Sequence, residues 1–149
     1  MLRLSKKILF AIEAVLDIAY HSSNTPVQSH QITKRQGIPR RYLEQALQHL
    51  VRENVLIGVR GPKGGYRLAR ERRRISVADV VRVVQVMEKN ENDDTLGSDL
   101  GCKVVEPLWL ELQIEMTVRL EKVSIDDLCN RAKDQGITSE GQRNLDFTI

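Results

Sequence analysis

The segment Arg60-Gly-Pro-Lys-Gly-Gly-Tyr66 constrains the fold more than any other part of this chain. Three glycines and one proline between positions 61 and 65 predict a tight reversal, because glycine adopts positive φ angles and proline holds φ at about −65°. Branched apolar residues at 55–59 precede the reversal and residues 66–68 follow it, which predicts a β-hairpin. Cations occupy its tip and flanks, at Arg60, Lys63, Arg67 and Arg70. Such a hairpin is suited to contact an anionic partner.

The net charge of +3 is distributed unevenly over the 149 residues. Residues 1–89 hold 17 Lys and Arg against 7 Asp and Glu, whereas residues 90–149 hold 6 against 13. The basic part is therefore predicted to meet a polyanion, with a merely solvated basic face as the alternative. Aromatic residues make up 4% of the chain, too few for binding of single strands through stacked bases.

Helical periodicity accounts for most of the remaining sequence. We expect helices over residues 5–21, 29–36, 39–52, 76–88, 104–123 and 124–133, with Ser5, Ser29, Ser76 and Ser124 at their starts and Gly37 ending the second. Pro107 fits only in the first turn of its helix. The polar stretch 89–101 predicts a loop, and residues from Gly136 onward a tail. The fold class is mainly α with a small β-hairpin.

A helix, a short glycine-containing turn, a second helix and a hairpin follow one another in the order of a winged helix-turn-helix. The free side of helix 39–52 carries polar residues that can read base edges, namely Arg40, Arg41, Glu44, Gln45 and Gln48. Arginine pairs with guanine, glutamine with adenine, and glutamate accepts from cytosine. The hairpin cations Arg60, Lys63 and Arg67 would lie on phosphates or in the minor groove. Double-stranded DNA is the predicted partner, with structured RNA as an alternative.

Several motifs of this sequence resemble those of one family: Gln36-Gly-Ile-Pro39, Tyr42-Leu-Glu-Gln45, Arg60–Tyr66, Leu68-Ala-Arg70 and Ile75–Val80. They resemble the bacterial IscR/NsrR/CymR family of homodimeric winged-helix transcription regulators, over about Leu2 to Asn130. The resemblance implies that Arg41 and Glu44 meet base edges and that Arg60 enters the minor groove. It also implies that helix 104–123 crosses its mate in a homodimer. The candidate DNA-contacting residues are Arg40, Arg41, Tyr42, Glu44, Gln45, Gln48, Arg60, Gly61, Pro62, Lys63, Gly64, Gly65, Tyr66 and Arg67.

These features predict a division of the chain into four parts. Residues 1–88 form the DNA-binding domain, and residues 89–103 form a loop at the position where the family carries its sensor. Residues 104–134 form the dimerisation helix and a short last helix, and residues 135–149 form the tail. We expect a cytoplasmic regulator of a near-palindromic operator, because no signal-peptide layout or membrane-spanning stretch is present.

The loop before the dimerisation helix departs from the family's cluster-binding members, which carry three cysteines there. This chain retains only Cys102, and Asp93, Asp94 and Asp99 stand where other thiolates would be expected. One thiolate per subunit cannot hold an iron–sulfur cluster in the all-cysteine manner, and carboxylates are poor ligands for it. We therefore expect no cofactor and no metal site.

Cys102 has two interpretations of its own. It is a candidate redox-sensing thiol beside Lys103, acting alone or by bridging to its mate, and the alternative is an inert loop cysteine. Cys129 lies on an apolar stripe and is expected to be buried. The three histidines share no ligand spacing; His21 and His30 are expected in loops and His49 half-buried. No constellation indicates an enzyme.

A different class of function is open to the acidic half. Since the cluster ligands are missing, residues 90–149 could bind a regulatory protein that sets occupancy of the DNA, making the chain a partner-controlled interaction module.

Overall fold

The computed structural model describes residues 5–89 and 96–141. Helices α1 (Lys6–His21), α2 (Ser29–Gln36) and α3 (Arg40–Arg52) precede a two-stranded antiparallel sheet of β1 (Leu56–Val59) and β2 (Gly65–Leu68). Then follow α4 (Val77–Lys89), α5 (Glu106–Glu121) and α6 (Ile125–Asp134). Short turns at Arg72–Arg74 (3₁₀) and Gly101–Val105 (π) precede α4 and α5 respectively. The fold is mainly α with one hairpin, as the sequence predicts.

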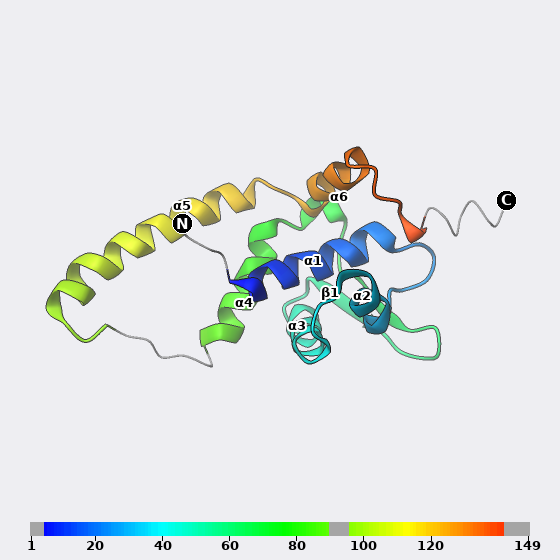
Figure 1. Cartoon of the computed structure of the whole chain (residues 1–149), viewed down its shortest axis with the longest axis horizontal. Coiled ribbons are helices and arrows are strands. Elements are labelled where there is room, and N and C mark those ends of the chain that lie inside the picture. The colour runs from blue at the N-terminus through cyan, green and yellow to red at the C-terminus, as the bar shows by residue number, and fades with distance from the viewer. Residues whose placement is uncertain (1–4, 90–95, 142–149) are drawn as a thin grey trace.

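Helix α1 is the centre of the core (Figure 1). It contacts α2, α3, α4 and α6, and its residues Ala14, Val15 and Ile18 are fully buried. Each neighbouring helix contributes aliphatic side chains at helical spacing to the same cluster, including Ile32, Leu43, Leu47, Leu50, Val80, Val84 and Ile125. Burying a side chain of this size stabilises the fold by about 1.5–3 kcal/mol, so this cluster fixes the relative positions of the helices.

Most of the predicted helix starts are confirmed by their capping bonds. The Ser5 hydroxyl accepts from the Ile8 amide, and Ser76 and Asp79 cap each other's backbone amides at 2.9 and 3.1 Å. Ser124 and Asp127 form the same reciprocal box. The prediction for Ser29 is wrong, because Gln28 is still extended and is the N-cap of α2; its amide donates to Gln31 Oε1 at 2.9 Å.

The hairpin is tied to the body of the domain by a third chain segment. Its register pairs Leu56 with Leu68 and Val59 with Gly65. Beyond that pairing, Tyr66 exchanges two backbone hydrogen bonds with Val27 in the α1–α2 loop, at 2.7 and 3.0 Å. The hairpin is therefore anchored to the body at the Tyr66 end of β2.

Helix α5 projects from the domain as an arm (Figure 1), and the helical segment that leads into it begins earlier than expected. Residues 99–105 are already helical, where the sequence predicted a loop as far as residue 103. The Glu106 amide donates to the Gly101 carbonyl in a π turn, and Pro107, which has no amide hydrogen, follows in the first turn of α5 as predicted. No residue of α5 is buried in the chain as described.

The expected C-terminal tail is in part a packed segment. Ser139 Oγ donates to the Tyr20 carbonyl at 2.6 Å, the Tyr20 hydroxyl donates to the Ile137 carbonyl, and the Glu140 amide donates to His21 Nδ1 at 3.0 Å. Residues 137–141 thus cover the end of α1, and the predicted tail from 142 onward lies outside the described residues. His21 is correspondingly the last residue of α1 rather than a loop residue, with a side chain 7% exposed. His30 also lies in a helix, α2.

Candidate nucleic-acid interface

Helix α3 is amphipathic: one face packs in the core, and the opposite, outer face carries the polar side chains. Leu43, Ala46, Leu47 and Leu50 are buried, and Arg40, Arg41, Glu44, Gln45 and Gln48 are exposed. Arg40 Nε lies 3.1 Å from Glu44 Oε1, one turn along the helix. Both side chains are more than half exposed, and such pairs contribute little stability, so either group can exchange its partner for a ligand at small cost.

The tip of the hairpin has a shape that only glycine permits. Gly61 has φ +109°, and a Cβ at Gly64 would lie 2.2 Å from the Val59 carbonyl oxygen. The Gly64 amide closes the turn on the Gly61 carbonyl at 2.9 Å. The turn leaves the side chains of Arg60 and Lys63 exposed at the tip, together with Pro62.

Three predicted contact residues also have partners inside the protein. The Tyr42 hydroxyl donates to the Lys7 carbonyl at 2.5 Å, which joins α3 to α1. Arg67 Nη2 donates to the Asn24 carbonyl at 2.6 Å, and Tyr66 is half-buried against the core. These side chains hold α3 and the hairpin in place, in contrast to the exposed side chains of Arg41 and Gln45 beside them.

Arg70, a cation of the hairpin's flank, has an internal role that the sequence did not suggest. Its guanidinium donates to the Arg74 and Asn54 carbonyls at 3.0 and 2.9 Å and to Asp79 Oδ2 at 3.0 Å. Asp79 lies in the first turn of α4 and forms the capping box with Ser76, so Arg70 joins the base of the hairpin to that helix. A basic motif on its own does not distinguish this role from contact with an anion.

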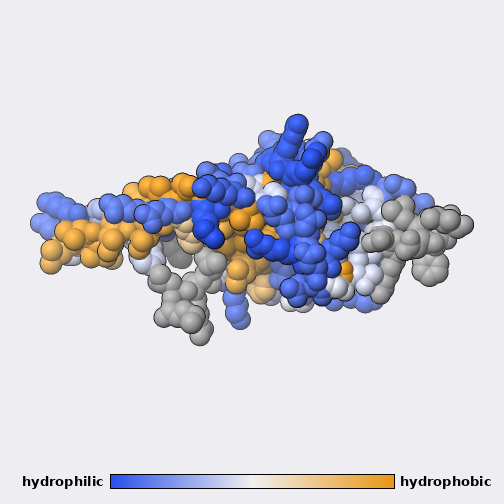
Figure 2. Space-filling model, turned by 90° about the horizontal axis from the view of Figure 1, so that it is seen from above, coloured by the Kyte–Doolittle hydropathy of each residue, from blue (hydrophilic) through white to orange (hydrophobic). Residues whose placement is uncertain are grey.

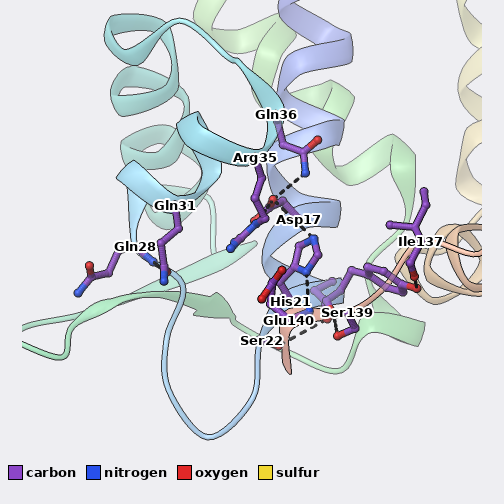
Figure 3. Close-up of polar contacts among 12 residues, drawn as sticks. Asp17, His21, Ser22, Gln28, Gln31, Arg35, Gln36, Ile137, Ser139 and Glu140 are labelled. Carbon is purple, nitrogen blue, oxygen red and sulfur yellow. Dashed lines mark hydrogen bonds and ion pairs between the residues drawn. The ribbon is translucent and has the colours of Figure 1, made fainter. Parts of the chain in front are cut away.

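A buried polar cluster behind α2 was also missed. Asp17 on α1 accepts from Arg35 Nε at 2.9 Å, from Arg35 Nη2 at 2.7 Å and from Gln36 Nε2 at 2.8 Å (Figure 3). His21 Nε2 lies 4.0 Å from the same carboxylate. The hydrogen bond to Asp17 raises the pKa of Arg35, and burial lowers the pKa of His21 against the opposing effect of Asp17. The available signal was an acid between the apolar residues Leu16 and Ile18 of α1.

The two cysteines lie in different environments. Cys102 is exposed in the π turn before α5, where its thiol donates to the Leu96 carbonyl at 2.6 Å. Cys129 is 2% exposed as predicted, and burial raises the pKa of its thiol. No group of three His, Cys, Asp or Glu side chains in residues 5–89 and 96–141 is placed to hold a metal ion. The donors present do not fit a cluster held by three thiolates.

Helix α5 carries a broad apolar surface (Figure 2). Seven of its large apolar side chains are each 42–57% exposed: Leu108, Trp109, Leu110, Leu112, Ile114, Met116 and Val118. The described helices include none that is long and apolar enough to cross a bilayer.

Comparison with known proteins identifies the kind of regulator to which this architecture belongs. Residues 4–131 match the model of the Rrf2 family, described as iron-dependent transcriptional regulators. The chain is 36% identical over 132 residues to the HTH-type transcriptional regulator IscR of Xenorhabdus nematophila, covering 85% of this chain and 79% of that protein.

Two solved structures share the architecture. IscR of T. potens superimposes with a TM-score of 0.72 at 29% identity, over 93% of each chain. CymR, the global cysteine regulator of B. subtilis, shares the fold with a TM-score of 0.67 at 21% identity, over 88% of this chain and 98% of its own. The resemblance seen in the sequence motifs is confirmed, and these relatives are DNA-binding regulators rather than enzymes. The chain belongs to the Rrf2 family of transcriptional regulators.

Proposed function

We propose that this regulator acts as a homodimer that reads a near-palindromic operator, without an iron–sulfur cluster. The observation that carries the proposal is the placement of the exposed polar face of α3 beside a glycine-shaped cationic hairpin. Helix α3 packs directly on β1, so one domain can present both elements to adjacent grooves of a duplex.

Within this proposal α3 reads bases and the hairpin contacts the backbone or minor groove. Arg40, Arg41, Glu44, Gln45 and Gln48 supply donors and acceptors for base edges. Arg60 and Lys63 supply the cations of the tip, and the four residues Gly61, Pro62, Gly64 and Gly65 supply its shape. Tyr42, Tyr66 and Arg67 complete the surface while anchoring it from within.

The test compares specific and random DNA for a matched pair of variants. Wild-type protein selects duplex fragments from a random-sequence pool at physiological salt, and Arg60→Ala is expected to lose about 1–3 kcal/mol of binding to the selected fragment. Arg73→Ala is the control, because Arg73 is an exposed arginine beyond β2, away from the turn, and pairs with Glu71. Equal losses in the two variants, or a wild-type protein that selects nothing, would contradict the proposal. Structured RNA added as competitor should leave the complex intact.

The apolar surface of α5 supports assembly into a dimer. Contiguous apolar surface of this extent marks an interaction site on a soluble protein. We infer that α5 of a second copy covers it, which places two hairpins and two α3 helices on half-sites spaced by about 10 bp.

The oligomeric state tests this assignment directly. Leu112→Glu should convert a dimer to a monomer in light scattering and weaken operator binding, whereas the neighbouring Glu111→Gln should not. A wild-type protein that is monomeric at every concentration, and dimerises only with a different protein, would instead support the partner-controlled module.

A further inference from the structure

Asp17 is the one charged residue that is buried within the described parts of the chain, at 3% exposure. It lies on α1 among aliphatic core residues, and its side chain has no exposed area at all. A carboxylate in such a place loses its hydration and must recover the loss through hydrogen bonds to charged or polar donors.

The hydrogen bonds that compensate for the lost hydration come from the last turn of α2. Arg35 donates two parallel hydrogen bonds to the Asp17 carboxylate, and Gln36 donates a third (Figure 3). The Arg35 side chain is itself only 21% exposed. Two parallel bonds between a planar guanidinium and a carboxylate fix the relative orientation of the groups as well as their distance.

Helix α2 itself contributes few side chains that could set its orientation. It has 8 residues, too few for independent helical stability, and Ile32 is its single buried side chain. Buried Val27 and Ile38 hold the chain just before and just after the helix, but apolar contacts of this kind do not select one orientation of its last turn. The hydrogen bonds of Arg35 and Gln36 to the Asp17 carboxylate fix that orientation.

The C-terminal end of α2 is also where the recognition helix is attached. Gln36 is its last residue, Gly37 turns the chain with φ +68°, and α3 begins at Arg40. The orientation of the last turn of α2 therefore bears directly on the start of α3, at Arg40 and Arg41, through a three-residue turn that contains the buried Ile38.

We propose that Asp17, with Arg35 and Gln36, is a positioning cluster that sets the orientation of α3 for sequence-selective binding. The inference rests on the proposed function, in which α3 reads base edges. A buried ion pair is a weak source of net stability compared with an apolar core, whereas fixing one arrangement among several is its best supported use. The cluster acts on selectivity through geometry and contacts no DNA.

Arg35→Lys separates geometry from charge. Lysine keeps the positive charge but cannot make two parallel bonds, so contact with phosphates and the net charge of the protein are unchanged. We expect affinity for the duplex selected by the wild-type protein to fall about tenfold, and affinity for a random duplex at the same salt to stay within about twofold. Gln36→Ala leaves the ion pair in place. It should lower the ratio of the affinity for the selected duplex to the affinity for a random duplex by about threefold.

Two controls exclude a purely structural effect. Ile32→Val destabilises the same helix without touching the cluster and should leave the ratio of specific to random affinity unchanged. Arg73→Lys makes the same chemical change at an exposed site. Circular dichroism and thermal unfolding establish that each variant is folded at the temperature of the binding assay.

The outcomes distinguish this inference from the proposed function. A wild-type protein with no preference among duplexes would overturn both. A selective wild-type protein, with folded Arg35→Lys and Gln36→Ala variants that keep the wild-type ratio, would overturn the positioning role alone, as would an equal change in the ratio for Ile32→Val.

Discussion

Gly65 allows the hairpin to approach the α1–α2 loop more closely than any other residue would. A Cβ at this position would lie 2.4 Å from the Val27 carbonyl oxygen and 2.7 Å from its carbon, and these are backbone atoms that cannot rotate away. Its φ of +154° is also one that residues with a side chain rarely adopt. Gly65→Ala should therefore separate the hairpin from Val27.

The size of the effect follows from what is lost. The two backbone hydrogen bonds between Tyr66 and Val27 contribute about 1 kcal/mol each, and backbone strain at a position reserved for glycine adds about 1–3 kcal/mol. We expect the free energy of unfolding to fall by about 3–5 kcal/mol, a large part of the stability of a domain of this size.

Gly58→Ala is the matched control in the partner strand. A Cβ there would meet nothing within 4 Å, and its φ is not in the positive region. This variant should have a free energy of unfolding within about 1 kcal/mol of the wild type. Urea denaturation monitored by circular dichroism measures both, and hydrogen exchange at the Tyr66 amide reports on the bridge itself. If Gly65→Ala is as stable as Gly58→Ala and keeps the Tyr66 amide protected, the close approach to Val27 is not what anchors the hairpin.

Two further predictions concern titration and oxidation. Burial lowers the pKa of His21 despite Asp17 and Glu140 nearby, with Arg35 acting in the same direction as burial, so the folded protein binds the proton less readily than the unfolded chain. The contribution of His21 to the free energy of unfolding should therefore be fully present above about pH 6.5 and be lost as the pH falls through the folded pKa. In urea denaturation from pH 7 to 5, His21→Gln should remove this part of the pH dependence of the free energy of unfolding. If Cys102 is a redox-sensing thiol, diamide should alter operator binding by the wild-type protein but not by Cys102→Ser; an identical response in both proteins would identify an inert cysteine.

Local signals were sufficient for much of the fold. The hairpin, the helix starts at Ser76 and Ser124, and the helix end at Gly37 are each encoded within a few residues, and the structure confirms these predictions. The one wrong cap shows the limit of such signals, because Ser29 and Gln28 both offer polar side chains and the extended backbone of Gln28 decides between them.

Contacts between distant segments could not be predicted in this way. Residues 137–141 look like a polar tail, but they pack on α1 more than a hundred residues earlier. Arg67 and Arg70 share the cationic motif of the hairpin, yet their guanidinium groups donate to carbonyls brought close only by the fold. Asp17 is an acid between apolar residues of α1, but its partner Arg35 lies 18 positions away on another helix. Sequence patterns reveal that such residues are unusual, but they do not reveal which distant residues are their hydrogen-bond partners.

The anchoring of the hairpin at Val27 has a thermodynamic consequence for DNA binding. Because backbone bonds to Val27 and the contact of Arg67 with Asn24 already order this element in the free protein, little conformational entropy remains to be lost when it enters a groove. Regulators whose arms fold upon DNA show a large negative heat-capacity change on association. For this protein the heat capacity of binding should reflect only the surface that rigid elements bury, and the binding enthalpy should therefore change little with temperature.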